Sequence, residues 1–116
     1  MLVTTEMTVS VGAVDDVKEM ARLFKALADE TRLRLVKLLA EQEPEEALCV
    51  TALAINLGVT QSAVSQHLAV LRAVGLVIDE RRGYFVHYRL NRARLREWRS
   101  RVGTVLGEDF ARALTG

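Results

Sequence analysis

The chain has few of the residues that build disulfide scaffolds, metal cages or β-rich folds. Its 116 residues include one cysteine, one proline and 5% aromatic residues. The single cysteine, Cys49, excludes an internal disulfide and a zinc site made of several thiolates from one chain. No apolar run reaches the roughly 18 residues that cross a bilayer, and the first residues lack the basic start of a secretory signal. We therefore expect a cytoplasmic protein without a membrane partner.

What is present fits one globular domain rich in helices. Half of the residues are apolar and 27% are charged, which is typical of folded soluble domains. Residues 1–13 show weak alternation and no helix signal, so we expect a flexible tail followed by one domain over residues 14–114. Within it, residues 15–28 and 29–41 carry apolar side chains at the three- and four-residue steps of helices.

The formal net charge of +1 hides a strong asymmetry along the chain. Residues 1–58 hold six basic against ten acidic residues, whereas residues 72–101 hold nine arginines against three acidic residues. A concentrated basic segment indicates an anionic partner, and nucleic acid is the commonest one. A solvated helix face would account for the charge alone equally well.

The middle of the chain carries the signals of a helix-turn-helix. Residues 50–57 have the length of a two-turn helix, and Gly58 follows where a left-handed residue would end it. Thr60 can then cap a new helix that continues to Val74 without proline or glycine. Two helices joined through a short turn that contains glycine form a helix-turn-helix.

The second of these helices has two different sides. At 100° per residue, Val64, Leu68 and Leu71 point one way, and short polar side chains without a carboxylate point the other way. Amides and hydroxyls suit base edges in the major groove. The predicted DNA contacts on and beside this helix are Thr60, Gln61, Ser62, Ser65, Gln66 and Arg72.

Residues 76–90 alternate in the manner of a β-hairpin around Gly83. Arg81 and Arg82 lie near its tip. A basic hairpin directly after a recognition helix forms a wing, which can contact phosphate or the minor groove. We therefore predict Arg81 and Arg82 as phosphate contacts.

The segment from Asn91 to about Leu114 carries one apolar stripe at helical steps. The stripe exceeds what the core of so small a domain needs, so we expect it to meet another subunit; the alternative is that it folds back over its own core. The residues of the stripe are Leu95, Trp98, Val102, Val105, Leu106 and Phe110.

Several ordered motifs resemble those of the ArsR/SmtB family of bacterial winged-helix repressors. The resemblance covers roughly residues 15–110 and rests on residues 23–35, 61–68, 75–77 and 88–90. It implies a mainly α winged-helix fold with a helix-turn-helix, a two-stranded β wing and five or so helices. It further implies a homodimer formed by the first and last helices, which adds Val17 and Met20 to the interface, an inverted-repeat operator in double-stranded DNA, and release by an inducer.

The metal sites of the resembled family are mostly missing. One has Leu-Cys-Val-Cys before the recognition helix, where this chain has Cys49 and then Thr51 in place of the second thiolate, and a hydroxyl is a poor ligand for a soft ion. A second site needs two acidic residues and two histidines in the last helix; the corresponding residues are Arg92, Arg94 and Val105, with Glu108 retained. We predict no cofactor. Cys49 is the one candidate metal ligand, and the alternative is that it is a small buried hydrophobe.

The predicted function is sequence-specific DNA binding by a homodimeric repressor. The alternative is a winged-helix module that binds another protein without DNA specificity. No nucleophile, paired-carboxylate or phosphate-loop pattern indicates an enzyme. His67 lies away from the polar face and is expected to pack or cap, whereas His87 is placed in the wing either as a phosphate contact or as an exposed strand residue. The effector, a metal or a small molecule, stays open.

Overall fold

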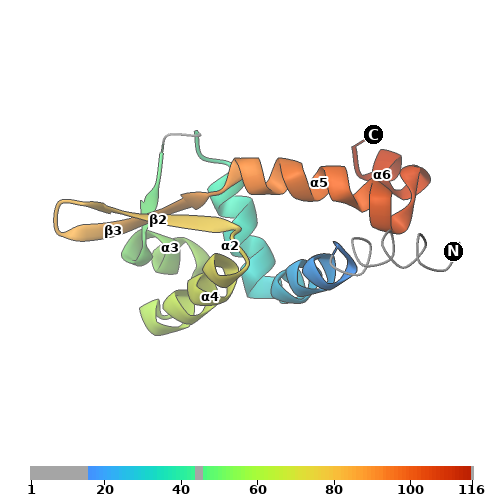
Figure 1. Ribbon diagram of the computed structural model, residues 1–116. Coiled ribbons are helices and arrows are strands. Elements are labelled where there is room, and N and C mark those ends of the chain that lie inside the picture. Colours follow the sequence, from blue (N-terminus) through green and yellow to red (C-terminus); the bar gives the residue numbers. More distant parts are fainter. Residues whose placement is uncertain (1–15, 44–45, 116) are drawn as a thin grey trace, which may run out of the picture.

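The computed structural model describes residues 16–43 and 46–115, and the predicted tail over residues 1–13 lies outside this part (Figure 1). No helix in the described part is long and apolar enough to cross a membrane. A helix over residues 16–27 is followed by α2 (Glu30–Ala40), β1 (Leu48–Cys49), α3 (Val50–Leu57), α4 (Gln61–Ala73), β2 (Val77–Arg82), β3 (Phe85–Leu90), α5 (Arg92–Leu106) and α6 (Glu108–Thr115). The predicted mainly α winged-helix fold with a helix-turn-helix is confirmed.

One apolar core joins the helices to the base of the wing. Its members come from the 16–27 helix, α2, α3, α4, the turn after α4 and both long strands: Leu23, Leu35, Leu39, Leu53, Ala54, Val64, Leu68, Leu71, Leu76, Val77 and Leu90. Burial of each large side chain contributes about 1.5–3 kcal/mol. This core fixes one side of α4 and leaves its other side at the surface.

Side-chain caps set where the helices begin. Asp29 accepts a hydrogen bond from the backbone N–H of Arg32 at 3.0 Å, at the start of α2. Thr60 accepts one from the N–H of Ala63 at 3.1 Å, at the start of α4. The Thr60 cap was predicted from sequence, and such caps each contribute about 1 kcal/mol. The Thr60 cap fixes the first turn of the helix that carries the polar face.

Gly58 forms the turn between α3 and α4 in the left-handed conformation that the sequence predicted. Its φ is 66°, and its N–H donates to the carbonyl groups of Ala54 and Ile55 at the end of α3. A Cβ at this position would meet no atom within 4 Å. The backbone conformation, and not space, therefore favours glycine at this position.

We expect Gly58→Ala to lower the free energy of unfolding by about 1–2 kcal/mol, because a Cβ is strained at positive φ. Gly58→Asn is expected to lose less, since asparagine tolerates the left-handed region. Urea denaturation of the three proteins measures both changes. Equal stability of the alanine variant and the unsubstituted protein would contradict this account of the turn.

The sheet has one strand more than the predicted two-stranded wing. Its order is β1-β3-β2, and all pairs are antiparallel. In β1, Leu48 pairs with Tyr88 and Cys49 pairs with His87. A strand of two residues has no periodicity to detect, and it forms only because β3 offers an open edge. The predicted two-stranded wing is confirmed as β2 and β3, and β1 adds a third strand at the edge of β3.

The C-terminal segment is two helices instead of one continuous run. Gly107, with a φ of 94°, ends α5, and its N–H bonds to the carbonyl of Gly103 at 3.1 Å. Glu108 and Asp109 then occupy the first turn of α6, where carboxylates are favoured by the helix dipole. The predicted single apolar stripe is therefore divided between two helix axes.

Candidate nucleic-acid interface

The polar side of α4 is exposed over its whole length. Val64, Leu68 and Leu71 are at most 1% exposed, so the core holds the opposite side. The predicted contact residues on the free side are all exposed: Thr60, Gln61, Ser62, Ser65, Gln66 and Arg72. No residue of α4 is acidic. This face therefore presents hydrogen-bonding groups to solvent with nothing that would repel a phosphate backbone.

The wing extends from the same end of the molecule as α3 and α4, and α5 and α6 extend from the other end (Figure 1). The register of β2 and β3 pairs Arg81 with Val86 and Arg82 with Phe85. Arg81 and Arg82 are thus adjacent to the turn and exposed, as predicted. The recognition face and the wing tip can both be reached by one elongated ligand.

The three arginines among the predicted DNA contacts differ in their own contacts. Arg72 donates to Asp79 at 3.2 Å, which joins the end of α4 to β2. Arg82 donates to Glu80 at 2.6 Å. For Arg81, the described residues provide no hydrogen-bond or ion-pair partner. Arg81 therefore offers a phosphate its full charge, whereas the other two would first share theirs with an acid.

Two aromatic residues at the wing tip were missed by the sequence interpretation. Tyr84 is 96% exposed and Phe85 is 65% exposed. The alternation over residues 76–90 includes both as ordinary strand residues. The available signal was their position directly after Gly83, where a hairpin turn leaves side chains uncovered. Exposed aromatic groups beside arginine suit contact with sugars and base edges in a minor groove.

Comparisons with known proteins agree with this geometry. A model described as "Bacterial regulatory protein, arsR family" matches residues 29–79, which run from the cap of α2 into β2. A solved ArsR-like transcriptional regulator from Rhodococcus sp. RHA1 is 31% identical, with a TM-score of 0.67, over 85% of this chain and 89% of that one. The chain belongs to the ArsR family.

Two further relatives extend the comparison of this ArsR-family chain. The arsenical resistance operon repressor of Escherichia coli K12 is 50% identical over 70 residues, which are 60% of this chain and 57% of that protein. The chain spans 52–58% of the length of other curated ArsR-family regulators that it matches. A homodimeric winged helix-turn-helix DNA-binding domain from Mycobacterium bovis is 30% identical, with a TM-score of 0.61, over 79% of this chain and 82% of that one.

The residues predicted for the ArsR-type dimer interface divide into two groups. Met20 and Val102 are 3% and 0% exposed within the single chain. Leu95 and Trp98 are half-buried and pack against the chain's own core. The remaining residues are exposed or half-buried: Val17 at 50%, Leu106 at 45%, Phe110 at 44%, and Val105. Met20, Leu95, Trp98 and Val102 thus fit the alternative in which the stripe folds back over its own core. The dimer contact stays a prediction that depends on the four more exposed residues.

Cys49 does not gather further metal ligands around it. It is half-buried and unpaired, and no cluster of three or more His, Cys, Asp or Glu residues forms in the described part of the chain. His87 lies opposite Cys49 in the sheet, and its buried Nδ1 has no hydrogen-bond partner among the residues that the structure describes. His67 Nδ1 accepts a hydrogen bond from Nη1 of Arg32 at 3.3 Å, in line with its predicted packing or capping role.

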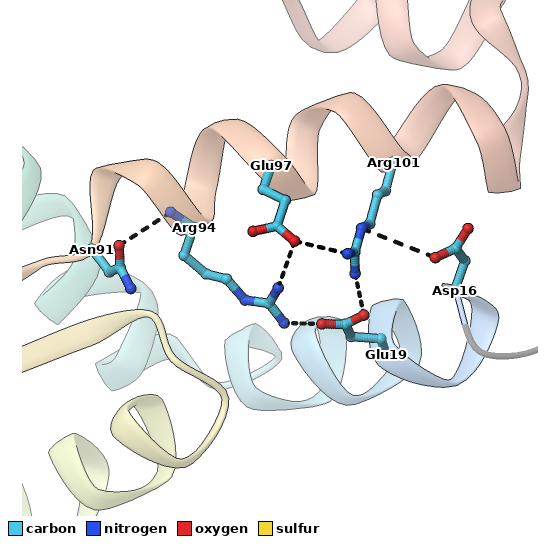
Figure 2. A network of polar contacts seen from close by, with 6 residues as sticks. All are labelled: Asp16, Glu19, Asn91, Arg94, Glu97 and Arg101. Atoms are coloured by element: carbon cyan, nitrogen blue, oxygen red, sulfur yellow. Dashed lines mark hydrogen bonds and ion pairs between the residues drawn. The ribbon is translucent and has the colours of Figure 1, made fainter. Parts of the chain in front are cut away.

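An ion-pair network ties the 16–27 helix to α5 (Figure 2). Glu19 accepts hydrogen bonds from both Arg94 and Arg101. Glu97 accepts from Arg101 at 2.7 Å and from Arg94 at 3.4 Å. The hydrogen bond from Arg94, with the charges of both arginines, holds the pKa of Glu19 below its ordinary value of 4.5, although burial acts in the opposite direction. The network links the two helices that ArsR resemblance assigns to dimerisation.

We expect Glu19→Gln to lower the melting temperature near neutral pH and to have little effect in acid. Because the folded-state pKa of Glu19 is lowered, its stabilisation is fully present above about pH 4.5 and is lost as the pH falls through the folded value. Thermal melts of both proteins from about pH 7 to pH 3.5 measure this. The control is Glu30→Gln, whose pair with Arg34 is 80% exposed on the Glu30 side and so contributes little. A difference that persists unchanged in acid would show that Glu19 acts in another way.

Proposed function

We propose that this ArsR-family chain is a sequence-specific DNA-binding regulator of transcription, which acts as a homodimeric repressor and is released from DNA by an effector. The observation that carries the proposal is the exposed, carboxylate-free polar side of α4. A helix with a buried apolar side and an ordinary solvent face would more often carry glutamate and lysine on its free side. Family membership supports the same function.

In this proposal α4 lies in the major groove. Gln61, Ser62, Ser65 and Gln66 contact base edges, where glutamine pairs best with adenine and serine accepts several partners. The wing lies beside the duplex, with Arg81 on a phosphate and Tyr84 toward the minor groove. In a two-fold dimer, the two copies of α4 would read half-sites one or two helical turns apart in an inverted repeat.

The direct test is selection of bound duplexes from a random-sequence pool by the purified protein. We expect enrichment of an inverted repeat whose half-sites are spaced by about one or two helical turns. Retention of duplexes without any sequence enrichment would contradict sequence-specific recognition. A protein that retains no DNA and is monomeric would instead favour the protein-interaction module, in which the exposed Val17, Leu106 and Phe110 dock another chain.

Homodimer formation is supported by those three exposed apolar residues, which lie on the 16–27 helix, α5 and α6. Sedimentation at micromolar concentration measures it directly. Replacement of Phe110 by glutamate should shift the population toward monomer and weaken binding to the inverted repeat more than binding to one half-site.

Arg81→Gln is expected to weaken binding to all DNA sequences alike. Each phosphate contact adds about 0.9 to the slope of log affinity against log salt, so a dimer should lose about two units of slope. Arg82→Gln should lose less, because Glu80 already shares its charge. The control is Arg99→Gln, an exposed arginine of α5. Anisotropy titrations over a range of salt concentrations measure the slopes, and an unchanged slope for Arg81→Gln would remove the wing from the interface.

A further inference from the structure

An open cleft of about 390 Å³ lies where the 16–27 helix, the end of α4 and the start of α5 meet. It is lined by Lys18, Glu19, Arg22, Leu23, Ala73, Val74 and Arg94. The volume lies within the range of sites for small organic molecules. The cleft is separate from the polar side of α4 and contains no residue that the DNA-binding proposal uses.

The charges around the cleft are unbalanced. Lys18, Arg22 and Arg94 contribute three cations against the single carboxylate of Glu19. Lys18 and Arg22 have no hydrogen-bond or ion-pair partner in the part of the chain that the structure describes. Arg94 is shared between Glu19 and Glu97. Cations that converge on a concave surface attract anions and hold them by charge-assisted hydrogen bonds.

The remaining lining residues are apolar. Leu23 is 1% exposed and belongs to the core, Val74 is half-buried, and Ala73 is exposed. A bare inorganic ion would leave this side of the cleft in contact with water. The lining therefore suits an anionic head group attached to a short apolar part.

Arg94 connects the cleft to the recognition helix. Its side-chain atoms lie 3.6–3.9 Å from the place that a Cβ on Gly75 would take, so the side chain packs on the turn that follows α4. The terminal Nη2 of the guanidinium on the same side chain donates to Glu19 on the 16–27 helix, as Figure 2 shows. An anion that draws this guanidinium from Glu19 would change the packing on Gly75.

We propose that this cleft binds a small organic anion, a carboxylate or a phosphate ester with a short apolar part. The second half of the proposal rests on the DNA-binding function proposed above: occupation of the cleft weakens operator binding. Ala73 is the last residue of α4 and Val74 is its C-cap residue, so the anion would contact the C-terminal end of the helix whose N-terminal half carries the proposed base contacts. Thermodynamic linkage then requires that DNA weaken anion binding by the same factor.

The first experiment measures binding without DNA. Backbone amide resonances of the full chain are followed during titration with hexanoate, with inorganic phosphate and with neutral hexanamide. We expect saturable shifts at Leu23, Val74 and Arg94 with the two anions and none with the amide. The ratio of the affinities for hexanoate and phosphate distinguishes a carboxylate site from a phosphate site.

The variants isolate the cations of the cleft. The double variant Lys18→Gln/Arg22→Gln should lose at least tenfold in anion affinity. Its matched control, Lys25→Gln/Arg96→Gln, removes one lysine and one arginine from exposed positions outside the cleft and should bind as the unsubstituted protein does. If the first double variant does not give the dispersed spectrum of a folded chain, the two single variants replace it. No saturable shift with either anion, or equal affinities of both double variants, would overturn the proposal.

The second experiment measures DNA binding by anisotropy, with saturating hexanoate or an equal ionic strength of chloride. Hexanoate should weaken binding to the selected operator at least fivefold, and the Lys18→Gln/Arg22→Gln variant should not respond. If operator affinity were unchanged at saturating hexanoate, the proposed effect of the anion on DNA binding would be overturned, whereas the proposed anion site would stand. Failure to bind any duplex in chloride would instead contradict the proposed DNA-binding function. The titrations followed by backbone amide resonances would still decide whether the cleft binds anions.

Discussion

Replacement of Ser65 by glutamate is expected to reduce operator affinity at least 100-fold while the protein remains folded. Ser65 is exposed on α4 between Ser62 and Gln66, so the new carboxylate would face the DNA at the centre of the polar side. A like charge placed in an interface costs several kcal/mol, and each 1.4 kcal/mol is a factor of ten in affinity. In a homodimer the change is made twice, once for each half-site.

The same substitution elsewhere provides the control. Ser100 is also exposed, but it lies on α5 with Arg96 and Arg99 nearby along the helix. Ser100→Glu adds the same charge to the protein and should leave operator affinity within about twofold, once sedimentation has shown that the oligomeric state is unchanged. Anisotropy titrations at one salt concentration measure both variants. Similar losses for the two would mean that total charge, and not the α4 face, controls binding.

The part of the fold that sequence predicts well is the part that local signals specify. Thr60 caps α4 and Gly58 ends α3 as expected, because each needs only its immediate neighbours to favour its conformation. The two sides of α4 follow from helix periodicity alone, since the apolar residues repeat at three- and four-residue steps. The candidate interface on α4 could be predicted from sequence for the same reason, because its residues lie within a few turns of one helix.

The features that sequence did not predict depend on contacts between distant segments. The two-residue strand β1 exists because β3 lies beside it. The break between α5 and α6 at Gly107 was not predicted, because the apolar pattern continues on both sides of it. Met20 and Val102 have the same spacing signal as exposed interface residues, and only the packing of the folded chain shows that they are covered. Arg82 pairs with Glu80, whereas Arg81 has no partner among the described residues, and this difference depends on side-chain positions that the sequence does not specify.

Substitution on the buried side of α4 should lower the stability of the protein and not its intrinsic operator affinity, which is the opposite of what we expect for Ser65→Glu. Leu68 is 1% exposed and lies in the core, on the same helix and only three residues further on. We expect Leu68→Ala to lower the free energy of unfolding by about 2–5 kcal/mol, because the substitution removes buried methyl groups and leaves a cavity. This is a large part of the about 5–15 kcal/mol that stabilises an ordinary domain. Its effect on operator binding should come only from the unfolded fraction.

The control for Leu68→Ala is Val70→Ala, since Val70 lies on the same helix but is 38% exposed and should lose less than about 1 kcal/mol. Urea denaturation at one protein concentration measures both, because the stability of a dimer depends on concentration. At a temperature where Leu68→Ala is folded, its operator affinity should approach that of the unsubstituted protein, whereas Ser65→Glu should bind poorly at every temperature. If Leu68→Ala were as stable as Val70→Ala, α4 would not be held by its apolar side, and the polar side would have no fixed direction from which to read DNA.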